Sequence, residues 1–428
     1  IEPINKNFMT LSQKKFYPWL VVALLWVVAL LNYMDRQMLS TMRDAMAVDI
    51  ADLESKVMFG KIMAAFMWIY GFMSPVSGIV ADRINRKWLI VASLAVWSTV
   101  TLLMGYATTY EEIYWLRAAM GVSEALYIPA ALSLIADYFT GKQLSLAIGI
   151  HMTGLYMGQA VGGFGAFVAA HLSWQSTFHW FGIVGIAYAL VLIFFLHEKR
   201  VAASAGAARG EQQPLGKVLR GNLQAVGRSL GMLLTCVAYW AILFFFATSS
   251  VPGWATKNWL PTLFADSLGI DMVWAGPVAT ITIAFASFVG VMVGGPMADR
   301  WSRKNLKGRI YTSSIGLSLM IPSLVFMGYG TSLVAAVGAG ILFGFGYGLF
   351  DANNMPILCQ FVSDRSRGTA YGIMNMSGLF IGALATNVLG TLADQGLMGL
   401  GFVFMAGALV LALVAQLVVL KPKTLNME

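Results

Sequence analysis

The sequence predicts an all-α membrane protein of twelve transmembrane helices arranged in two six-helix bundles. Hydrophobic residues make up 58% of its 428 residues and charged residues only 11%, whereas soluble domains carry about 25% charged residues. Apolar runs of roughly 20 residues or more, enough to cross a bilayer, recur between short polar turns. Matching segments also occur in the two halves of the chain. This composition excludes a water-soluble protein.

The apolar runs define twelve candidate spans, at 18–45, 57–81, 88–107, 112–139, 142–170, 175–197, 230–264, 271–298, 309–328, 332–361, 367–392 and 396–420. The long polar segment 198–229 has no apolar period and is predicted to link the two halves. We therefore expect one six-helix bundle at 18–197 and another at 230–420. The remaining polar ends, 1–17 and 421–428, are expected to form tails.

The loops after the second and eighth spans carry the same motif. Residues 78–87 read GIVADRINRK and residues 295–304 read GPMADRWSRK. A second match, AIGI at 147–150 and AYGI at 370–373, lies at nearly the same offset and indicates duplicated halves. We interpret the loop motif as gating or structural rather than phosphate-binding, with ion pairs made by Asp82, Arg83, Arg86, Asp299, Arg300 and Arg303.

Basic and acidic residues separate onto opposite sides of the predicted membrane. The tails, the linker and both motif loops collect the lysines and arginines that give the net charge of +8. The opposite loops carry Asp44, Asp49, Asp52, Glu54, Glu111, Glu112, Asp266, Asp271 and Asp394. Because lysine and arginine prefer the cytoplasmic side, we expect both termini and the linker in the cytoplasm. The charge therefore indicates orientation, not nucleic-acid binding, and the short external loops favour a multi-pass protein of a bacterial inner (plasma) membrane.

The first span contains the sequence Asn32-Tyr33-Met34-Asp35-Arg36. A charged residue at membrane depth costs about 2.5 kcal/mol or more and usually faces a cavity that serves substrate or ion movement. Adjacent helical residues point about 100° apart, so Asp35 and Arg36 need separate partners. Arg36 shares a helical face with Asn32, one turn earlier.

The fourth span offers partners for both charges. Arg117 and Glu124 lie two helical turns apart and share a face, with Gly121 between them. We predict that Asp35 pairs with Arg117 and that Glu124 pairs with Arg36. An acid whose charge depends on whether its arginine is engaged has the property that a proton carrier requires. The alternative is a permanent structural network.

Arg36 is the predicted ligand of an anionic substrate, because a guanidinium binds a carboxylate through two parallel hydrogen bonds. Lys257, in the seventh span, either supplies a second positive charge or extends to the outer interface. Asn353 and Asn354 either contact a hydroxylated substrate or hold helices together. The remaining candidates for the cavity wall are Asn32, Tyr33, Tyr70, Trp68, His151, Tyr156 and Gln159.

The loop motif and the twelve spans resemble the major facilitator superfamily over nearly the whole chain. Within it, the Asn32–Arg36 and Arg117–Glu124 segments look like the anion:cation symporter branch, which includes hexuronate, galactonate and sialic acid transporters. The resemblance implies that Asp35 and Glu124 are protonation sites, that Arg36 binds the substrate carboxylate and that Arg117 tunes them. It also implies a monomer with protons as coupling ion and no other cofactor.

We therefore expect a proton-coupled symporter of an acidic sugar, such as a uronate, aldonate, sialate or acidic disaccharide. The first-span motif is also similar to spinster-like transporters, so an exporter of an amphiphilic lipid is the alternative. A solute sensor is a third possibility, although no signalling domain accompanies the spans. The sequence shows no metal-ligand cluster, nucleophile motif or nucleotide loop, which argues against an enzyme.

Overall fold

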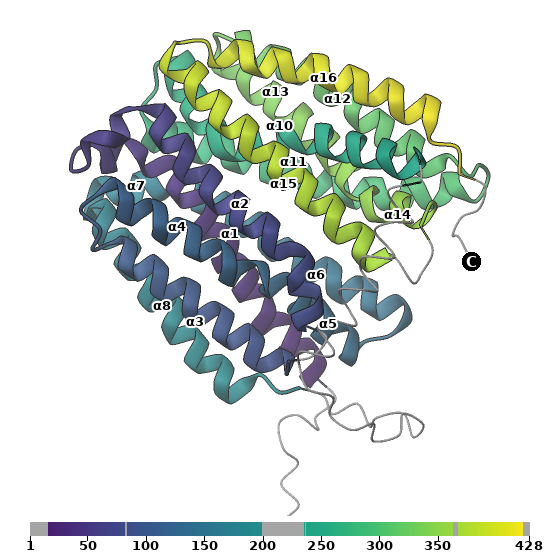
Figure 1. Ribbon diagram of the computed structural model, residues 1–428, viewed down its shortest axis with the longest axis horizontal. Helices are drawn as coiled ribbons and strands as arrows, with labels where there is room; N and C mark the ends of the chain where they lie inside the picture. The colour runs from purple at the N-terminus through teal and green to yellow at the C-terminus, as the bar shows by residue number, and fades with distance from the viewer. Residues whose placement is uncertain (1–15, 82–83, 199–234, 236, 363–366, 423–428) are drawn as a thin grey trace, which may run out of the picture.

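The computed structural model describes residues 16–81, 84–198, 235, 237–362 and 367–422 (Figure 1). Within them the regular structure is helical. The helices of the first half are α1 (Tyr17–Ala47), η2 (Ala51–Glu54), α2 (Lys56–Ala81), α3 (Arg86–Met104), α4 (Tyr110–Ala125), α5 (Tyr127–Tyr138), α6 (Gly141–Gly162), α7 (Gly165–Leu172) and α8 (Trp174–Phe195). Those of the second half are α10 (Val237–Leu268), α11 (Met272–Ser302), α12 (Gly308–Tyr329), α13 (Leu333–Asp351), α14 (Asn354–Cys359), α15 (Arg367–Asp394) and α16 (Met398–Val419).

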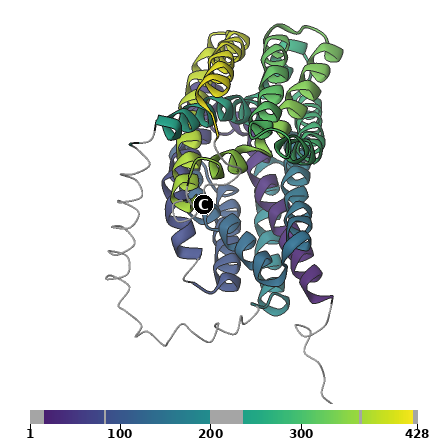
Figure 2. The ribbon, with the colours of Figure 1, turned by 90° about the vertical axis from the view of Figure 1, so that its right-hand side faces the viewer.

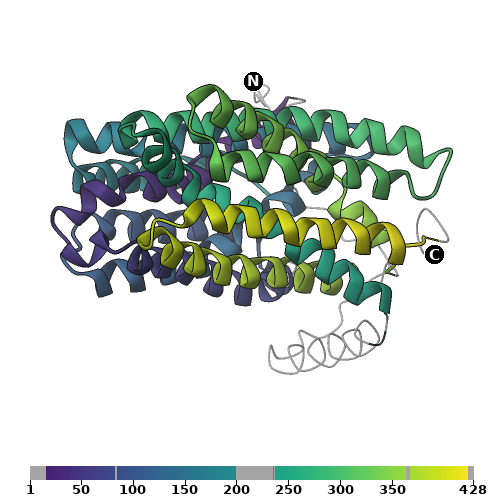
Figure 3. The same cartoon turned by 90° about the horizontal axis from the view of Figure 1, so that it is seen from above.

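The helices form two groups that follow chain order. Figures 1 and 2 show α1 to α8 on one side of the molecule and α10 to α16 on the other, and Figure 3 shows the long helices running side by side. The groups meet where α2 packs on α15, α6 on α11 and α1 on α10. Most of the predicted tails, nearly all of the predicted linker, and Asp82 and Arg83 of the first motif loop lie outside the described residues.

Ten of the described segments are long and apolar enough to cross a membrane, which confirms an all-helical, multi-pass membrane protein. The predicted spans at 142–170 and 230–264 are not among these ten. Both are helical nevertheless, as α6–α7 and α10. Polar residues such as Lys142, Gln143 and Gln159 lower the mean hydropathy of α6.

Three predicted spans are each divided into two helices. The fourth span breaks at Leu126, the fifth at Gly163 and the tenth at Ala352 and Asn353. Proline is the third residue of both α5 and α14, at Pro129 and Pro356. Proline suits the first turn of a helix, where the amide hydrogen that it lacks has no intrahelical partner. The fourth and tenth spans thus restart in the same way in both halves.

The motif loops form ion pairs within their own halves. Arg86 pairs with Asp137 of α5, and Arg309 Nη2 lies 2.7 Å from Asp299 Oδ1. Arg300 and Arg303 are exposed and make no ion pair with the residues that the structure describes. The loops are therefore tied to neighbouring helices at this end of the molecule, called the basic end below.

The opposite, acidic end carries the loops with Asp49, Asp266 and Asp394, and there the two halves are joined. Asp394, the last residue of α15, accepts hydrogen bonds from Ser55 Oγ (2.9 Å) and from the backbone nitrogens of Lys56 (2.7 Å) and Val57 (3.2 Å). It caps the first turn of α2 in the other half, where backbone N–H groups have no helical partner. Lys56 also pairs with Asp266 at 2.7 Å.

Close packing of α1 on α6 depends on glycines one turn apart. Gly154, Gly158 and Gly162 face α1, and a Cβ at Gly158 would lie 2.2 Å from the carbonyl oxygen of Leu30. Small residues at this spacing let two membrane helices approach closely. Gly149, on the same helix, has open space around the same position.

We predict that Gly158→Ala lowers the thermal unfolding temperature of the purified protein by several degrees, because α1 and α6 must separate. Overpacking of this kind costs about 1–3 kcal/mol. Gly149→Ala is the matched control and should leave the temperature unchanged or raise it, since alanine favours a helix. Equal effects of the two substitutions would contradict the packing argument.

We further predict that Asp394→Ala opens the acidic end. Thr280 is 3% exposed there, so Thr280→Cys, in a background with Cys236 and Cys359 replaced by serine, should react slowly with a soluble maleimide. Adding Asp394→Ala should raise the rate several-fold. Asp271→Ala is the control, because Asp271 caps α11 within its own half. An equal rise with this control would mean that local fraying, and not separation of the halves, exposes Thr280.

Candidate functional site

A narrow cavity lies between the two halves and is lined by residues from both. The first half contributes Tyr33, Arg36, Gln37, Met63, Phe66, Met67, Arg117 and Gln159, and the second half Trp254, Lys257 and Asn258. Three of these side chains are cations, and three are aromatic. A ligand in this cavity therefore meets positive charge and aromatic surface from both halves.

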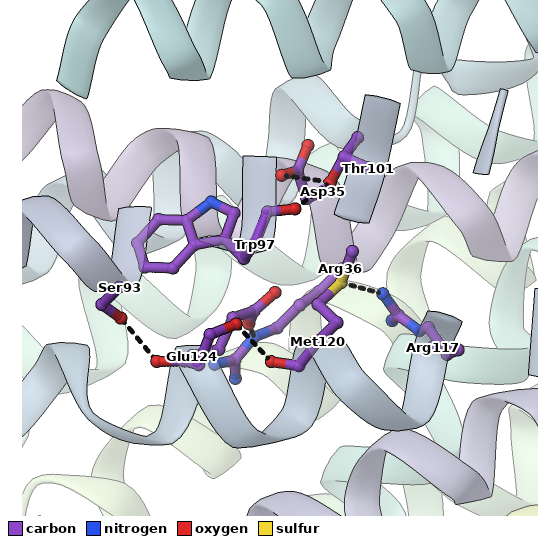
Figure 4. A network of polar contacts seen from close by, with 9 residues as sticks. Asp35, Arg36, Ser93, Trp97, Thr101, Arg117, Met120 and Glu124 are labelled. Carbon is purple, nitrogen blue, oxygen red and sulfur yellow. Dashed lines mark hydrogen bonds and ion pairs between the residues drawn. The ribbon is translucent and has the colours of Figure 1, made fainter. Parts of the chain in front are cut away.

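Arg36 and Glu124 form a buried ion pair, with Arg36 Nε 2.5 Å from Glu124 Oε2 (Figure 4). The guanidinium carbon also lies 4.9 Å from the ring centres of Tyr33 and Phe66 and 4.7 Å from that of Tyr70. Among the described residues, Arg36 Nη2 and Glu124 Oε1 have no hydrogen-bond partner. The rings fix the guanidinium while leaving a donor for a further acceptor.

The predicted pair between Asp35 and Arg117 is not formed. Asp35 instead accepts a hydrogen bond from Thr101 Oγ1 of α3 at 3.2 Å. Arg117 Nη1 lies 2.9 Å from Met120 Sδ, and its guanidinium carbon lies 4.7 Å from the ring centre of Phe66. Asp35 faces α3 while Arg117 turns toward α2, so the two side chains leave α1 and α4 in different directions (Figure 4).

The Phe66 ring contacts both guanidinium groups, those of Arg36 and Arg117. Gly121 makes this arrangement possible. A Cβ on Gly121 would lie 2.8 Å from the carbonyl oxygen of Phe66 and 3.0 Å from the nitrogen of Tyr70. The glycine thus lets α4 lie directly against α2, which places Arg117 and Glu124 beside the cavity.

Lys257 faces the cavity rather than the outer interface. Its Nζ lies 5.0 Å from the ring centre of Trp254 and 5.7 Å from those of Tyr33 and Tyr347. The Tyr33 ring therefore contacts a cation from each half, Arg36 and Lys257. The backbone oxygen of Lys257 also accepts a hydrogen bond from Gln37 Nε2 at 2.8 Å. Tyr33 and Gln37 together connect α1 to α10 beside the cavity.

The other predicted residues are either buried asparagines or side chains that pack against aromatic rings. Asn32 is fully buried beside the pair, and Tyr156 packs its ring 6.2 Å from Phe288 of the second half. Asn353 and Asn354 are buried, and their amides donate to Leu349 O at 2.9 Å and Asp351 Oδ1 at 3.4 Å. His151 packs against Tyr127, and Trp68 packs against Phe380.

Two residues at the site were not assigned a role from the sequence: Phe66 and Trp254. Phe66 lies four residues before Tyr70, so the two share a helical face, and this spacing was the available signal. Trp254 precedes Lys257 by three residues and shares its face in the same way.

A helical membrane protein whose two halves meet around a charged cavity has the architecture of a membrane transporter. The model of the family described as Major Facilitator Superfamily matches residues 25–386 and 285–425. The chain therefore belongs to this superfamily, and it is a transporter and not an enzyme.

Two bacterial transporters and one solved structure are similar to this chain over most of its length. A hexuronate transporter of Bacillus subtilis (strain 168) is 24% identical over 412 residues, which cover 94% of this chain and 93% of the relative. A probable galactarate/D-glucarate transporter of Escherichia coli (strain K12) is 24% identical over 405 residues, 87% of this chain and 86% of the relative. The crystal structure of a bacterial homologue of the human lysosomal transporter Spinster, inward-facing and unoccupied, has a TM-score of 0.69 at 19% identity. The match covers 95% of this chain and 96% of that one, and it shows the shared fold.

Proposed function

We propose that this protein is a proton-coupled symporter of a sugar acid. The observation that carries the proposal is the buried Arg36–Glu124 pair beside the cavity, in which one guanidinium nitrogen has no hydrogen-bond partner among the described residues. A substrate carboxylate and Glu124 compete for the same cation. The substrates of two relatives support this substrate class, since one relative is a hexuronate transporter and the other a probable galactarate/D-glucarate transporter.

The proposed topology has twelve spans in two bundles, with α6–α7 and α10 as the two spans beyond the ten apolar segments. The basic end faces the cytoplasm in this proposal, because its loops concentrate lysine and arginine. Closure at the acidic end then corresponds to an inward-facing arrangement. We propose a monomer in a bacterial inner membrane.

In the proposed cycle, a proton neutralises Glu124 and releases Arg36. The substrate carboxylate takes the place of Glu124 on the guanidinium, which the rings of Tyr33, Phe66 and Tyr70 hold in position. Proton and substrate each raise the affinity for the other, as coupling requires. Asp35 is a second proposed protonation site, and it accepts a hydrogen bond from Thr101 instead of pairing with an arginine.

Arg117 has a modified role in this proposal. It does not pair with Asp35, but it shares the Phe66 ring with Arg36 and places a second positive charge beside the pair. This charge favours the ionised form of Glu124 once the substrate has left, which helps to restore the ion pair. Lys257 supplies positive charge from the other half, and Gln159 supplies an amide to the cavity.

We expect Glu124→Gln to abolish gradient-driven accumulation of a labelled hexuronate in proteoliposomes while preserving exchange between hexuronate inside and outside. Glutamine has no charge to gain or lose, so Arg36 stays available whatever the pH. Glu112→Gln is the control, because it makes the same change on the same helix α4 in an exposed capping position. Accumulation by Glu124→Gln at the wild-type level would show that another group couples the proton.

We expect Arg36→Lys to raise the apparent KM for the hexuronate by about ten-fold or more, because lysine keeps the charge but loses the planar fork and its stacking on three rings. Lys61→Arg, a reverse change at an exposed position of α2, should leave the KM unchanged. An unaltered KM in Arg36→Lys would remove Arg36 from the binding site. If no sugar acid moves under any gradient, the symporter proposal fails, and a lysolipid, the substrate type of the spinster-like alternative, is then assayed.

A further inference from the structure

A second pocket, called the lateral pocket below, lies on the face of α2 that points away from the cavity around Arg36. Its volume is about 270 Å³, and its wall comes from α2, α4 and α15. The lining residues are Met58, Lys61, Ala64, Trp68, Tyr110, Tyr114 and Asn387. Phe66, which lines the other cavity, follows Lys61 by five residues and so points about 140° away from it. The lateral pocket is therefore a separate space, with no role in the transport cycle.

The lining of the lateral pocket contains one cation and, among the described residues, no carboxylate. Lys61 is exposed and makes no ion pair with any residue that the structure describes, and its Nζ lies 3.7 Å from Met58 Sδ. The side-chain oxygen of Asn387 is buried without a hydrogen-bond partner in the described part of the chain. A ligand that fits brings negative charge to the ammonium and a hydrogen-bond donor to the amide oxygen.

The lateral pocket lies near the acidic end, at the depth of a lipid head group. Lys61 follows the first residue of α2, Lys56, by five residues, which is about 8 Å along the helix axis. Tyr110 is the first residue of α4. Tyrosine and tryptophan concentrate at the interface between membrane and water, and lysine side chains extend toward it. The lining residues thus have the composition of a membrane interface.

An exposed apolar strip runs from the lateral pocket toward the basic end. The Trp68 ring centre lies 4.9 Å from that of Phe380, which lies 4.7 Å from that of Phe72. Phe72 and Leu384 are 60% and 53% exposed, inside segments that are apolar enough to cross a membrane. Leu384 precedes Asn387 by three residues and shares its helical face. A ligand whose polar head occupies the pocket therefore meets apolar surface on the side of the membrane interior.

We propose that the lateral pocket binds the head group of an anionic phospholipid of the phosphatidylglycerol type. The phosphate lies on Lys61, a glycerol hydroxyl donates to Asn387, and the acyl chains cover the strip that begins at Trp68. A zwitterionic lipid would bring an ammonium group beside Lys61, where no lining carboxylate balances it. Because α2 and α15 belong to different halves, the bound lipid contacts both. The site does not depend on the proposed transport of sugar acids.

The test titrates the purified full-length protein with phosphatidylglycerol or with phosphatidylcholine of the same acyl chains, and native mass spectrometry measures the bound lipid. The wild type should bind its first phosphatidylglycerol about ten-fold more tightly than phosphatidylcholine. Lys61→Gln should weaken this binding by about five-fold or more, the effect of one lysine charge near an anionic lipid, and leave phosphatidylcholine unaffected. Lys61→Arg, which keeps the charge, should retain the preference. Asn387→Leu should weaken phosphatidylglycerol binding by about three-fold.

Lys421→Gln is the control, because it removes an exposed lysine charge at the basic end and should leave the first phosphatidylglycerol bound as tightly as before. Equal losses in Lys421→Gln and Lys61→Gln would mean that overall charge attracts the lipid, which overturns the proposal. Equal binding of the two lipids by the wild type overturns it whatever the variants do. Glycerol 3-phosphate carries the phosphate without acyl chains, so displacement of the lipid by an equal concentration of it would indicate a site for a soluble anion and overturn the lipid assignment.

Discussion

The ion pair between Arg36 and Glu124 is the interaction on which the rest of the site depends. Both charges lie inside a membrane protein, where removing one partner leaves a costly unpaired charge. The pair is nevertheless incomplete, because one guanidinium nitrogen and one carboxylate oxygen have no partner among the described residues. Three aromatic rings support the guanidinium from other directions. The guanidinium therefore retains hydrogen-bonding capacity beyond its bond to Glu124.

Glycines decide where these charges meet. Gly121 allows α4 to approach α2, so that Arg117 reaches the face of Phe66 and Glu124 reaches Arg36. Gly158 allows α6 to approach α1, which brings the neighbouring Gln159 to the same cavity. A side chain at either glycine would separate a helix pair that carries site residues. The close backbone contacts and the positions of the charged side chains are therefore linked.

The sequence predicts the part of this arrangement that follows from periodicity and from the cost of burying charge. The spacing of Arg117 and Glu124 and the isolation of Arg36 in an apolar span were enough to predict the Arg36–Glu124 pair. The orientation of α4 about its axis was not predictable, so the expected Asp35–Arg117 pair was wrong: Thr101 and Phe66 are the partners instead. The position of Lys257 depends on Trp254 and Tyr347, and the second of these comes from a distant span.

Arg36 and Lys257 line the cavity from different halves, and the contacts that close the acidic end also join the halves. The Lys56–Asp266 pair is partly exposed, with side-chain exposures of 18% and 49%, and such pairs contribute about 0–1 kcal/mol. The Asp394 cap contributes about 1 kcal/mol. These two polar contacts are modest and add to the packing of α2 on α15. A molecule that contacts Arg36 in one half and Lys257 in the other would act at comparable strength. Contacts at the cavity and contacts at the acidic end thus act on the same two halves, which requires no additional element to link them.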